Sequence, residues 1–264
     1  MTAAHLAYAN ARLRARRTRV LRADAILRFV VSESPASTIP GWRDLAPDDA
    51  GGAVLDVVFG RLMAEYAFAV RVSPEAAPVL LALVRLHEIE NLKVVWRAIA
   101  RGRAVDEWRS CWRPLGRLES IALEGCQRAA SLRALADAVH GSPYGEIAAA
   151  TLRAHAADVE AADLEFDRWA LGQLRMAADR LDRREALARS LVQSVADERA
   201  LLPAIRAGRA LPAQLDVVRA ARDRLSARAF RGTPYCLAPL VAYLLSREAE
   251  ARALISAAEQ RARR

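Results

Sequence analysis

The spacing of apolar residues along the chain predicts helices. In the stretch 53–70 the large apolar side chains recur every three or four positions, which places them on one helical face. They are Leu55, Val58, Phe59, Leu62, Tyr66 and Ala69. No stretch alternates polar and β-branched residues as a half-buried strand would. The sequence therefore predicts an all-α protein with essentially no sheet.

Gly and Pro residues divide the rest of the chain into similar helical lengths. Ser73 with Pro74 predicts a helix start, with Ser73 as the N-cap, and this helix runs to Ala100 and ends at Gly102. Ser142 with Pro143 predicts the start of another long helix that continues through Leu174. The remaining predicted helices cover residues 3–31 (one or two helices), 115–139 (one or two), 183–207, 213–229 and 236–262.

An internal similarity suggests a repeated architecture. Residues 98–105 read AIARGRAV, and residues 204–211, which lie 106 positions further on, read AIRAGRAL. A looser similarity joins residues 87–91 to residues 247–251. Chance similarity in an Ala- and Arg-rich chain is the alternative explanation. If the repeat is real, the chain folds as pseudo-repeated helical subdomains that pack on their neighbours. These would cover residues 1–106, 107–211 and 212–264.

The charge balance indicates an anionic partner. The formal net charge is +9, and every basic residue except Lys93 is an arginine. Arginines without any acid fill residues 11–22, and a second basic cluster lies in residues 252–264. Such an excess favours contact with an anionic partner or a membrane surface. A nucleic-acid-binding protein fits the charge as well, but the arginines are spread over many predicted helices and mixed with 31 acids.

Residues that would support catalysis or metal binding are not found in a usable pattern. His87-Glu88 begins like a zinc-binding HExxH helix, but position 91, where the second His would stand, is Asn91. The chain has no phosphate-binding GxxxxGK loop and no CxxC pair. It has no run of 18 apolar residues and no signal-peptide pattern. Its three cysteines suit a reducing compartment. We therefore expect no enzymatic activity, no cofactor and no metal.

Three segments resemble one known family. The opening segment AYANARLRARR carries Tyr8, Asn10, Arg12 and Arg14. The segment ENLKVVWRAIARGR carries Asn91, Leu92, Arg97 and Gly102. The closing segment LVAYLLSREAE carries Tyr243, Glu248 and Glu250. These residues, in this order, are similar to the protein that caps the proteolipid ring in V-type and A-type rotary ATPases, called C in prokaryotes and d in eukaryotes.

The resemblance implies three similar helical subdomains that form a funnel-like body. It also implies a non-catalytic adapter of the central stalk, which couples the rotor shaft to the membrane proteolipid ring in proton or sodium transport. The implied partners are the proteolipid ring and the central-stalk proteins, without a small-molecule substrate or nucleic acid. The implied location is the cytoplasmic face of the membrane, as a peripheral protein. Only 34 residues separate Gly208 from Tyr243, so the third repeat looks shortened.

The motif residues have two alternative kinds of role. Asn91 either bonds to a neighbouring helix end or loop carbonyl and fixes the packing, or it touches the rotor stalk. We expect Tyr243 and Trp96 to pack with their polar ends satisfied. The cluster Arg16, Arg17 and Arg19 is either a solvated face or a surface that faces the ring or lipid headgroups. The alternative to the rotary-ATPase hypothesis is a basic helical protein that binds nucleic acid or acts as a scaffold.

Overall fold

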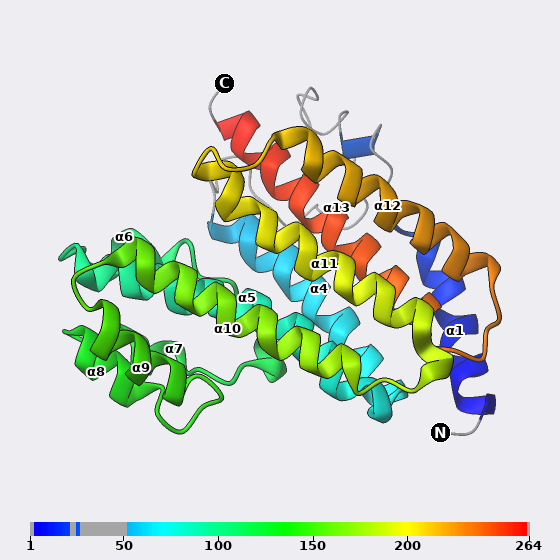
Figure 1. Ribbon diagram of the computed structural model, residues 1–264, viewed down its shortest axis with the longest axis horizontal. Helices are drawn as coiled ribbons and strands as arrows, with labels where there is room; N and C mark the ends of the chain where they lie inside the picture. Colours follow the sequence, from blue (N-terminus) through cyan, green and yellow to red (C-terminus); the bar gives the residue numbers. More distant parts are fainter. Residues whose placement is uncertain (1–2, 22–24, 27–51, 263–264) are drawn as a thin grey trace.

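The structure is a computed structural model that describes residues 3–21, 25–26 and 52–262 (Figure 1). All regular secondary structure in these residues is helical and none of it is strand, which confirms the all-α fold. The helices are α1 (Ala3–Arg17), α4 (Gly52–Val72), α5 (Ala77–Ala100), α6 (Val105–Arg109), α7 (Leu123–Gln127), α8 (Leu132–Ala138), α9 (Gly145–His155), α10 (Val159–Asp179), α11 (Ala186–Arg206), α12 (Pro212–Arg231) and α13 (Ala238–Ala262).

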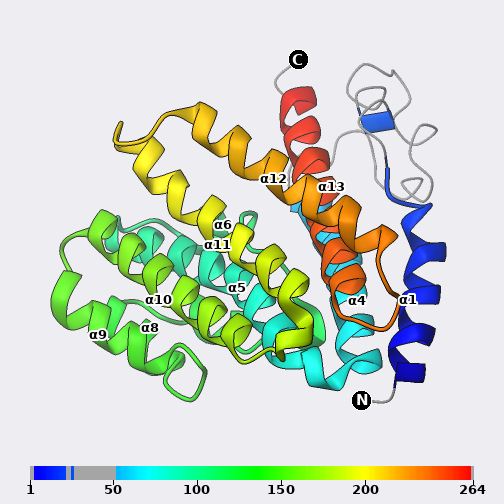
Figure 2. The ribbon, with the colours of Figure 1, turned by 45° about the vertical axis from the view of Figure 1, so that its right-hand side comes forward.

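The long helices pack side by side around one continuous core. Helix α10 packs against α5 and α11, α11 packs against α12 and α13, and α13 packs against α4 and α1. The short helices α6 to α9 gather at one end of the molecule, and α1 lies at the opposite end (Figures 1 and 2). The largest fully buried side chains include Trp96, Tyr66, Tyr144, Tyr243 and Phe166. Of these, Trp96 meets Phe166 edge to face, with ring centroids 5.2 Å apart.

The predicted ends of α5 and α11 are confirmed, and they share one hydrogen-bond pattern. Gly102 and Gly208 have φ of 63° and 67°, a left-handed conformation that glycine adopts without strain. After each glycine, a backbone N–H returns to the helix. Arg103 N donates to Ala98 O at 2.9 Å, and Arg209 N donates to Ala204 O at 2.8 Å. The similar segments AIARGRAV and AIRAGRAL are therefore two copies of one helix-ending signal. This local match does not establish a repeat of whole subdomains.

Three of the predicted helix boundaries are wrong. The helix predicted from Ser142-Pro143 through Leu174 is broken into α9 and α10, because Asp158 caps α10 by accepting a hydrogen bond from Ala161 N at 2.9 Å. The Ser73 side chain makes no capping hydrogen bond, and Pro74–Ala76 form a single 3₁₀ turn before α5 begins. Helix α1 ends at Arg17, short of the predicted residue 31; residues 27–31 lie outside the described residues.

The predicted subdomain boundaries run through contacts of the fold. Residue 106 falls inside α6, and α5 packs against α10 across this boundary. The second boundary, after residue 211, separates α11 from α12, which pack against each other. Helix α13, assigned to the shortened third repeat, packs against α4 of the first. The three-subdomain division and the funnel-like body stay predictions.

Within the described part of the chain, no single helix is both long enough and apolar enough to cross a membrane. By length and composition alone, residues Val54–Val72 and Pro74–Ala100 would qualify as a pair bent by 116°. Much of this pair is buried in the protein core.

Candidate functional site

Asn91 ties the middle of α5 to the loop that follows α6. Its side-chain amide donates to Arg113 O at 2.8 Å, and its Oδ1 accepts from Arg113 N at 2.9 Å. The Asn91 side chain is completely buried, and both of its polar atoms are satisfied. This is the packing role, one of the two alternatives that the sequence left open for Asn91. The amide replaces a partner strand for one residue of the loop and fixes its path over α5.

Glu88, one turn before Asn91, holds the next part of the same loop. It is fully buried and accepts hydrogen bonds from the backbone N–H groups of Ser120 and Ile121, the latter at 2.9 Å. The hydroxyl of Tyr144 donates to its second oxygen at 2.7 Å. Burial raises the pKa of this tyrosine, and Glu88 raises it further. Glu88 therefore acts as a buried anchor for backbone N–H groups, a role that was not predicted from the sequence.

The other motif residues of α5 face α10. Leu92 is fully buried in the core. Lys93 Nζ lies 2.6 Å from the carboxylate of Asp167, and Arg97 Nε lies 2.8 Å from that of Asp163. The two basic residues are four apart on α5 and the two acids are four apart on α10, so the pairs stack along one interface. These contacts keep α5 and α10 in a fixed register.

Asn10 and Glu250 attach α1 to the rest of the protein. The buried amide of Asn10 donates to Pro234 O and, at 3.0 Å, to Cys236 O, in the loop before α13. Glu250 on α13 accepts from Leu21 N at 3.0 Å, just after α1 ends. Both residues belong to the segments of the family resemblance. The first and third segments thus meet in space, although they lie more than 200 residues apart in the sequence.

Glu248 joins α4, α5 and α13. It is almost fully buried, accepts a hydrogen bond from the Tyr66 hydroxyl and lies 3.3 Å from His87 Nε2. Burial lowers the pKa of His87 more than Glu248 raises it, so the imidazole is neutral at pH 7. His87 Nδ1 has no hydrogen-bond partner in the described structure, which suits a neutral ring that donates through Nε2. Burial acts to raise the pKa of Glu248, but the hydrogen bonds from His87 and Tyr66 help to lower it.

The two aromatic residues expected to have satisfied polar ends differ. Tyr243 is buried, and its pKa is raised by burial first and then by the neighbouring Glu65. Trp96 is also fully buried, but its indole N–H has no partner among the described atoms. The expectation for Trp96 is therefore wrong: edge-to-face packing on Phe166 holds the ring without a hydrogen bond.

The N-terminal arginine cluster is partly used by the fold itself. Arg16 Nη1 lies 2.6 Å from Glu65, and its guanidinium stacks over Phe68, 4.1 Å from the ring centroid. Arg17 stacks over Phe230 of α12, 4.0 Å from the centroid. Two of the three cluster members thus help to seat α1 on its neighbours.

The outer face of α1 is exposed. Tyr8 is 59% exposed and accepts a hydrogen bond from Arg12 at 3.2 Å. Arg14 and Arg19 are exposed, and their side chains make no hydrogen bond or ion pair with the described residues. The structure therefore separates the opening segment into a buried anchor, Asn10, and an outward basic face.

A further buried acid, Glu198 on α11, draws together three helices. Its carboxylate binds Arg219 at 2.9 Å and also Arg222, both on α12, and Arg252 of α13 lies 4.0 Å away. Burial acts to raise the pKa of Glu198, but these arginines lower it. No role was predicted for Glu198 from the sequence. The signal was present as a single acid facing several arginines, but only the tertiary fold brings them together.

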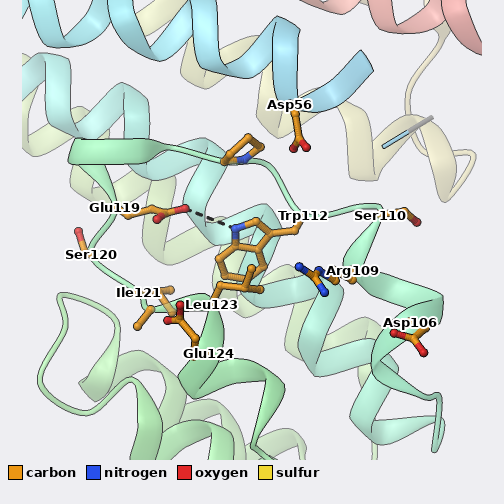
Figure 3. Close-up of a pocket in the computed structure, with 12 residues that line it drawn as sticks. Asp56, Asp106, Arg109, Ser110, Trp112, Glu119, Ser120, Ile121, Leu123 and Glu124 are labelled. Atoms are coloured by element: carbon orange, nitrogen blue, oxygen red, sulfur yellow. Dashed lines mark hydrogen bonds between the residues drawn. The ribbon is translucent and has the colours of Figure 1, made fainter. Parts of the chain in front are cut away.

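The largest hollow in the described surface is a groove of about 960 Å³ beside α6. It is bounded by Asp56 at the start of α4, by α6 and by residues 110–124. Figure 3 shows Trp112 at its centre, with its indole N–H donating to Glu119 at 3.4 Å. None of the motif residues lines it. Among the described residues, no three His, Cys, Asp or Glu side chains form a group that could hold a metal ion.

The structure thus defines an all-α protein whose motif side chains mainly hold helices and loops together. A family model described as ATP synthase (C/AC39) subunit matches residues 9–226. The chain therefore belongs to the C/AC39 family of V/A-type ATP synthase subunits, which confirms the resemblance seen in its sequence. The match ends inside α12, so Tyr243, Glu248 and Glu250 lie outside it. Neither a curated protein nor a solved structure matches the chain.

Proposed function

We propose that this protein is a non-catalytic adapter on the central stalk of a V/A-type rotary ATPase. It would couple the rotor shaft to the proteolipid ring and so serve proton or sodium transport. Membership of the C/AC39 family, over residues 9–226, is the observation that carries this proposal. It also favours the rotary-ATPase hypothesis over a basic nucleic-acid-binding protein or an unrelated scaffold. The partners would be the ring and the stalk proteins, at the cytoplasmic face of the membrane.

The packing of the motif residues supports a mechanical role. An adapter that transmits torque must resist deformation, and close-packed interiors have low compressibility. Asn91 and Glu88 fix a long loop to α5 through buried hydrogen bonds. Asn10 fixes α1 to the loop before α13. These bonds stiffen the irregular segments, which are otherwise the most easily deformed parts of a helical protein.

The outward face of α1 is the surface we assign to the ring or to lipid headgroups. Arg14 and Arg19 are exposed there and have no acidic partner in the described structure. Exposed arginines next to a membrane are attracted to anionic headgroups by about 1 kcal/mol each. Asn10, on the same helix, faces the protein interior and anchors this surface.

The test is to recover a tagged copy of the protein from membranes in mild detergent and to identify what is bound. We expect proteolipid and central-stalk proteins. The variant Arg14→Glu/Arg19→Glu should recover less proteolipid. The control variant Arg133→Glu/Arg153→Glu has the same charge change at exposed positions of α8 and α9, and should behave like the unmodified protein. Absence of both proteolipid and stalk proteins from the unmodified sample would refute the proposal.

A further inference from the structure

The groove beside α6 has an apolar floor and an acidic rim. Its floor is formed by Trp112, Pro114, Ile121 and Leu123. The acids that line it are Asp56, Asp106, Glu119 and Glu124, against one base, Arg109. Figure 3 shows Asp56 of α4 and Glu124 of α7 on opposite sides of Trp112. The rim is therefore negative on both sides of an aromatic centre.

This charge is opposite to that of the protein as a whole. The chain carries a net charge of +9, but three of the rim acids, Asp56, Asp106 and Glu124, are exposed and form no ion pair with any described residue. Glu119 differs, since it accepts hydrogen bonds from Trp112 Nε1 and, at 3.2 Å, from Leu115 N. It thus holds the floor in place and leaves the other three acids unneutralised. The negative rim repels phosphates, which excludes nucleic acids and anionic lipids as occupants.

We propose that this groove binds a basic amphipathic helix of a partner protein. Its apolar side would lie on Trp112, Ile121 and Leu123. Its Lys or Arg side chains would reach the carboxylates of Asp56, Asp106 and Glu124. A helix in an apolar groove is a common recognition mode, and complementary charge at the rim selects the partner and its orientation. The groove is at a site distinct from the outward face of α1, so the inference is independent of the contact proposed there.

The experiment uses the full chain and a fluorescein-labelled peptide of about 18 residues, or five helical turns, built from Leu and Lys with an amphipathic pattern. Fluorescence anisotropy should show binding that weakens as salt is raised, because exposed charge pairs are screened. A peptide with Glu in place of every Lys should not bind. Equal binding of the two peptides would overturn the proposal.

Two variants locate the binding. Asp56→Asn/Asp106→Asn/Glu124→Gln should weaken binding about tenfold, since three exposed ion pairs are lost. The control Asp137→Asn/Asp216→Asn/Glu259→Gln removes the same charge from exposed positions outside the groove and should bind normally. Equal loss in both variants would show non-specific attraction and overturn the proposal.

The floor is tested by Leu123→Ser, which keeps the rim charges and should weaken binding a few-fold at unchanged helicity. Unchanged binding would remove the floor from the site and contradict the proposed mode. Light scattering of the unmodified chain provides the last arm, in which we expect a monomer. Self-association that is lost in the groove variant would identify a second copy of the chain as the occupant, against the proposal. Recovery of proteolipid from membranes does not enter any of these outcomes, so the two proposals can fail separately.

Discussion

Two buried glutamates at similar sequence positions serve the fold in different ways. Glu88 on α5 and Glu248 on α13 occupy matching places in the segments HEIEN and REAEA, and each accepts a hydrogen bond from a buried tyrosine. The other partners of Glu88 are backbone N–H groups, which do not titrate. The other partner of Glu248 is His87, which does. One site therefore anchors a loop at any ordinary pH, and the other joins helices in a pH-dependent way.

The two buried asparagines extend this contrast. Asn91, near Glu88, uses both its donor and its acceptor on Arg113. Asn10, at the α1–α13 end, uses only its amide N–H₂, and its Oδ1 has no partner among the described atoms. The polar network around α5 is thus more completely satisfied than the network between α1 and α13. Unsatisfied buried groups weaken a network, so we expect the α5 end to be the more stable of the two.

The largest effect is expected for Glu88→Ala. The substitution leaves the N–H groups of Ser120 and Ile121 and the hydroxyl of Tyr144 without an acceptor inside the protein. Each buried group left unsatisfied costs about 1–3 kcal/mol, so the free energy of unfolding should fall by about 3 kcal/mol or more. Urea denaturation followed by circular dichroism measures this change.

Glu88→Gln is the matched control for that substitution. Its remaining oxygen can accept from the two backbone N–H groups, and its N–H₂ can donate to the Tyr144 hydroxyl, so the loss should be about 1 kcal/mol. A loss in Glu88→Ala as small as that in Glu88→Gln would show that the loop does not depend on this anchor.

The asparagine contrast predicts a smaller difference. Asn91→Ala removes a donor and an acceptor from one loop residue, which should lower the free energy of unfolding by about 2 kcal/mol. Asn10→Ala removes donors only, so about 1 kcal/mol is expected. The two variants can be compared in the same urea experiment. If Asn10→Ala is the more damaging of the two, the ranking of the two networks is reversed.

The His87–Glu248 pair predicts pH dependence. Burial lowers the pKa of His87 below its ordinary 6.5 in the folded state, so the unfolded chain binds a proton more readily. Stability from this group is therefore fully present above pH 6.5 and is lost as the pH falls below that value, by up to about 1.4 kcal/mol per pH unit. Glu248 contributes only at lower pH, because its pKa is also lowered.

His87→Gln isolates the contribution of this histidine. The glutamine N–H₂ can still donate to Glu248, but it has no proton to gain. Between about pH 7.5 and 5.5, the free energy of unfolding should fall by about 1 kcal/mol more in the unmodified protein than in His87→Gln. Parallel pH profiles would mean that His87 titrates alike in both states, and Glu248 would then be no different from Glu88.

The sequence predicted the positions of the long helices well because their ends carry strong local signals. Gly102 and Gly208 are such signals, and both lie in the left-handed conformation that ends a helix. The break before α10 was missed because the Ala-rich stretch around residues 150–162 favours helix on both sides of it. Asp158 alone marks the start of α10, and an aspartate cap is a weak signal without a nearby Gly or Pro.

The candidate site was predictable only in part, for a reason that Asn10 and Tyr8 illustrate. Both stand in the segment that resembles the family, two residues apart, yet Asn10 is completely buried and Tyr8 is exposed. A motif names residue types but not the face each one takes after packing. The groove around Trp112 could not be seen at all, because its acids come from separate elements that only the tertiary fold brings together.

The smallest effect is expected for Tyr8→Ser. Its ring is 59% exposed and its hydroxyl meets only Arg12, itself exposed, so the free energy of unfolding should change by less than about 0.5 kcal/mol. Asn10→Ala, two residues further along α1, should cost more in the same urea series, since the buried side of the helix carries its attachment. A loss above about 1 kcal/mol in Tyr8→Ser would mean that the outward face of α1 also holds the fold together. The division of the opening segment into a buried anchor and an exposed contact surface would then be wrong.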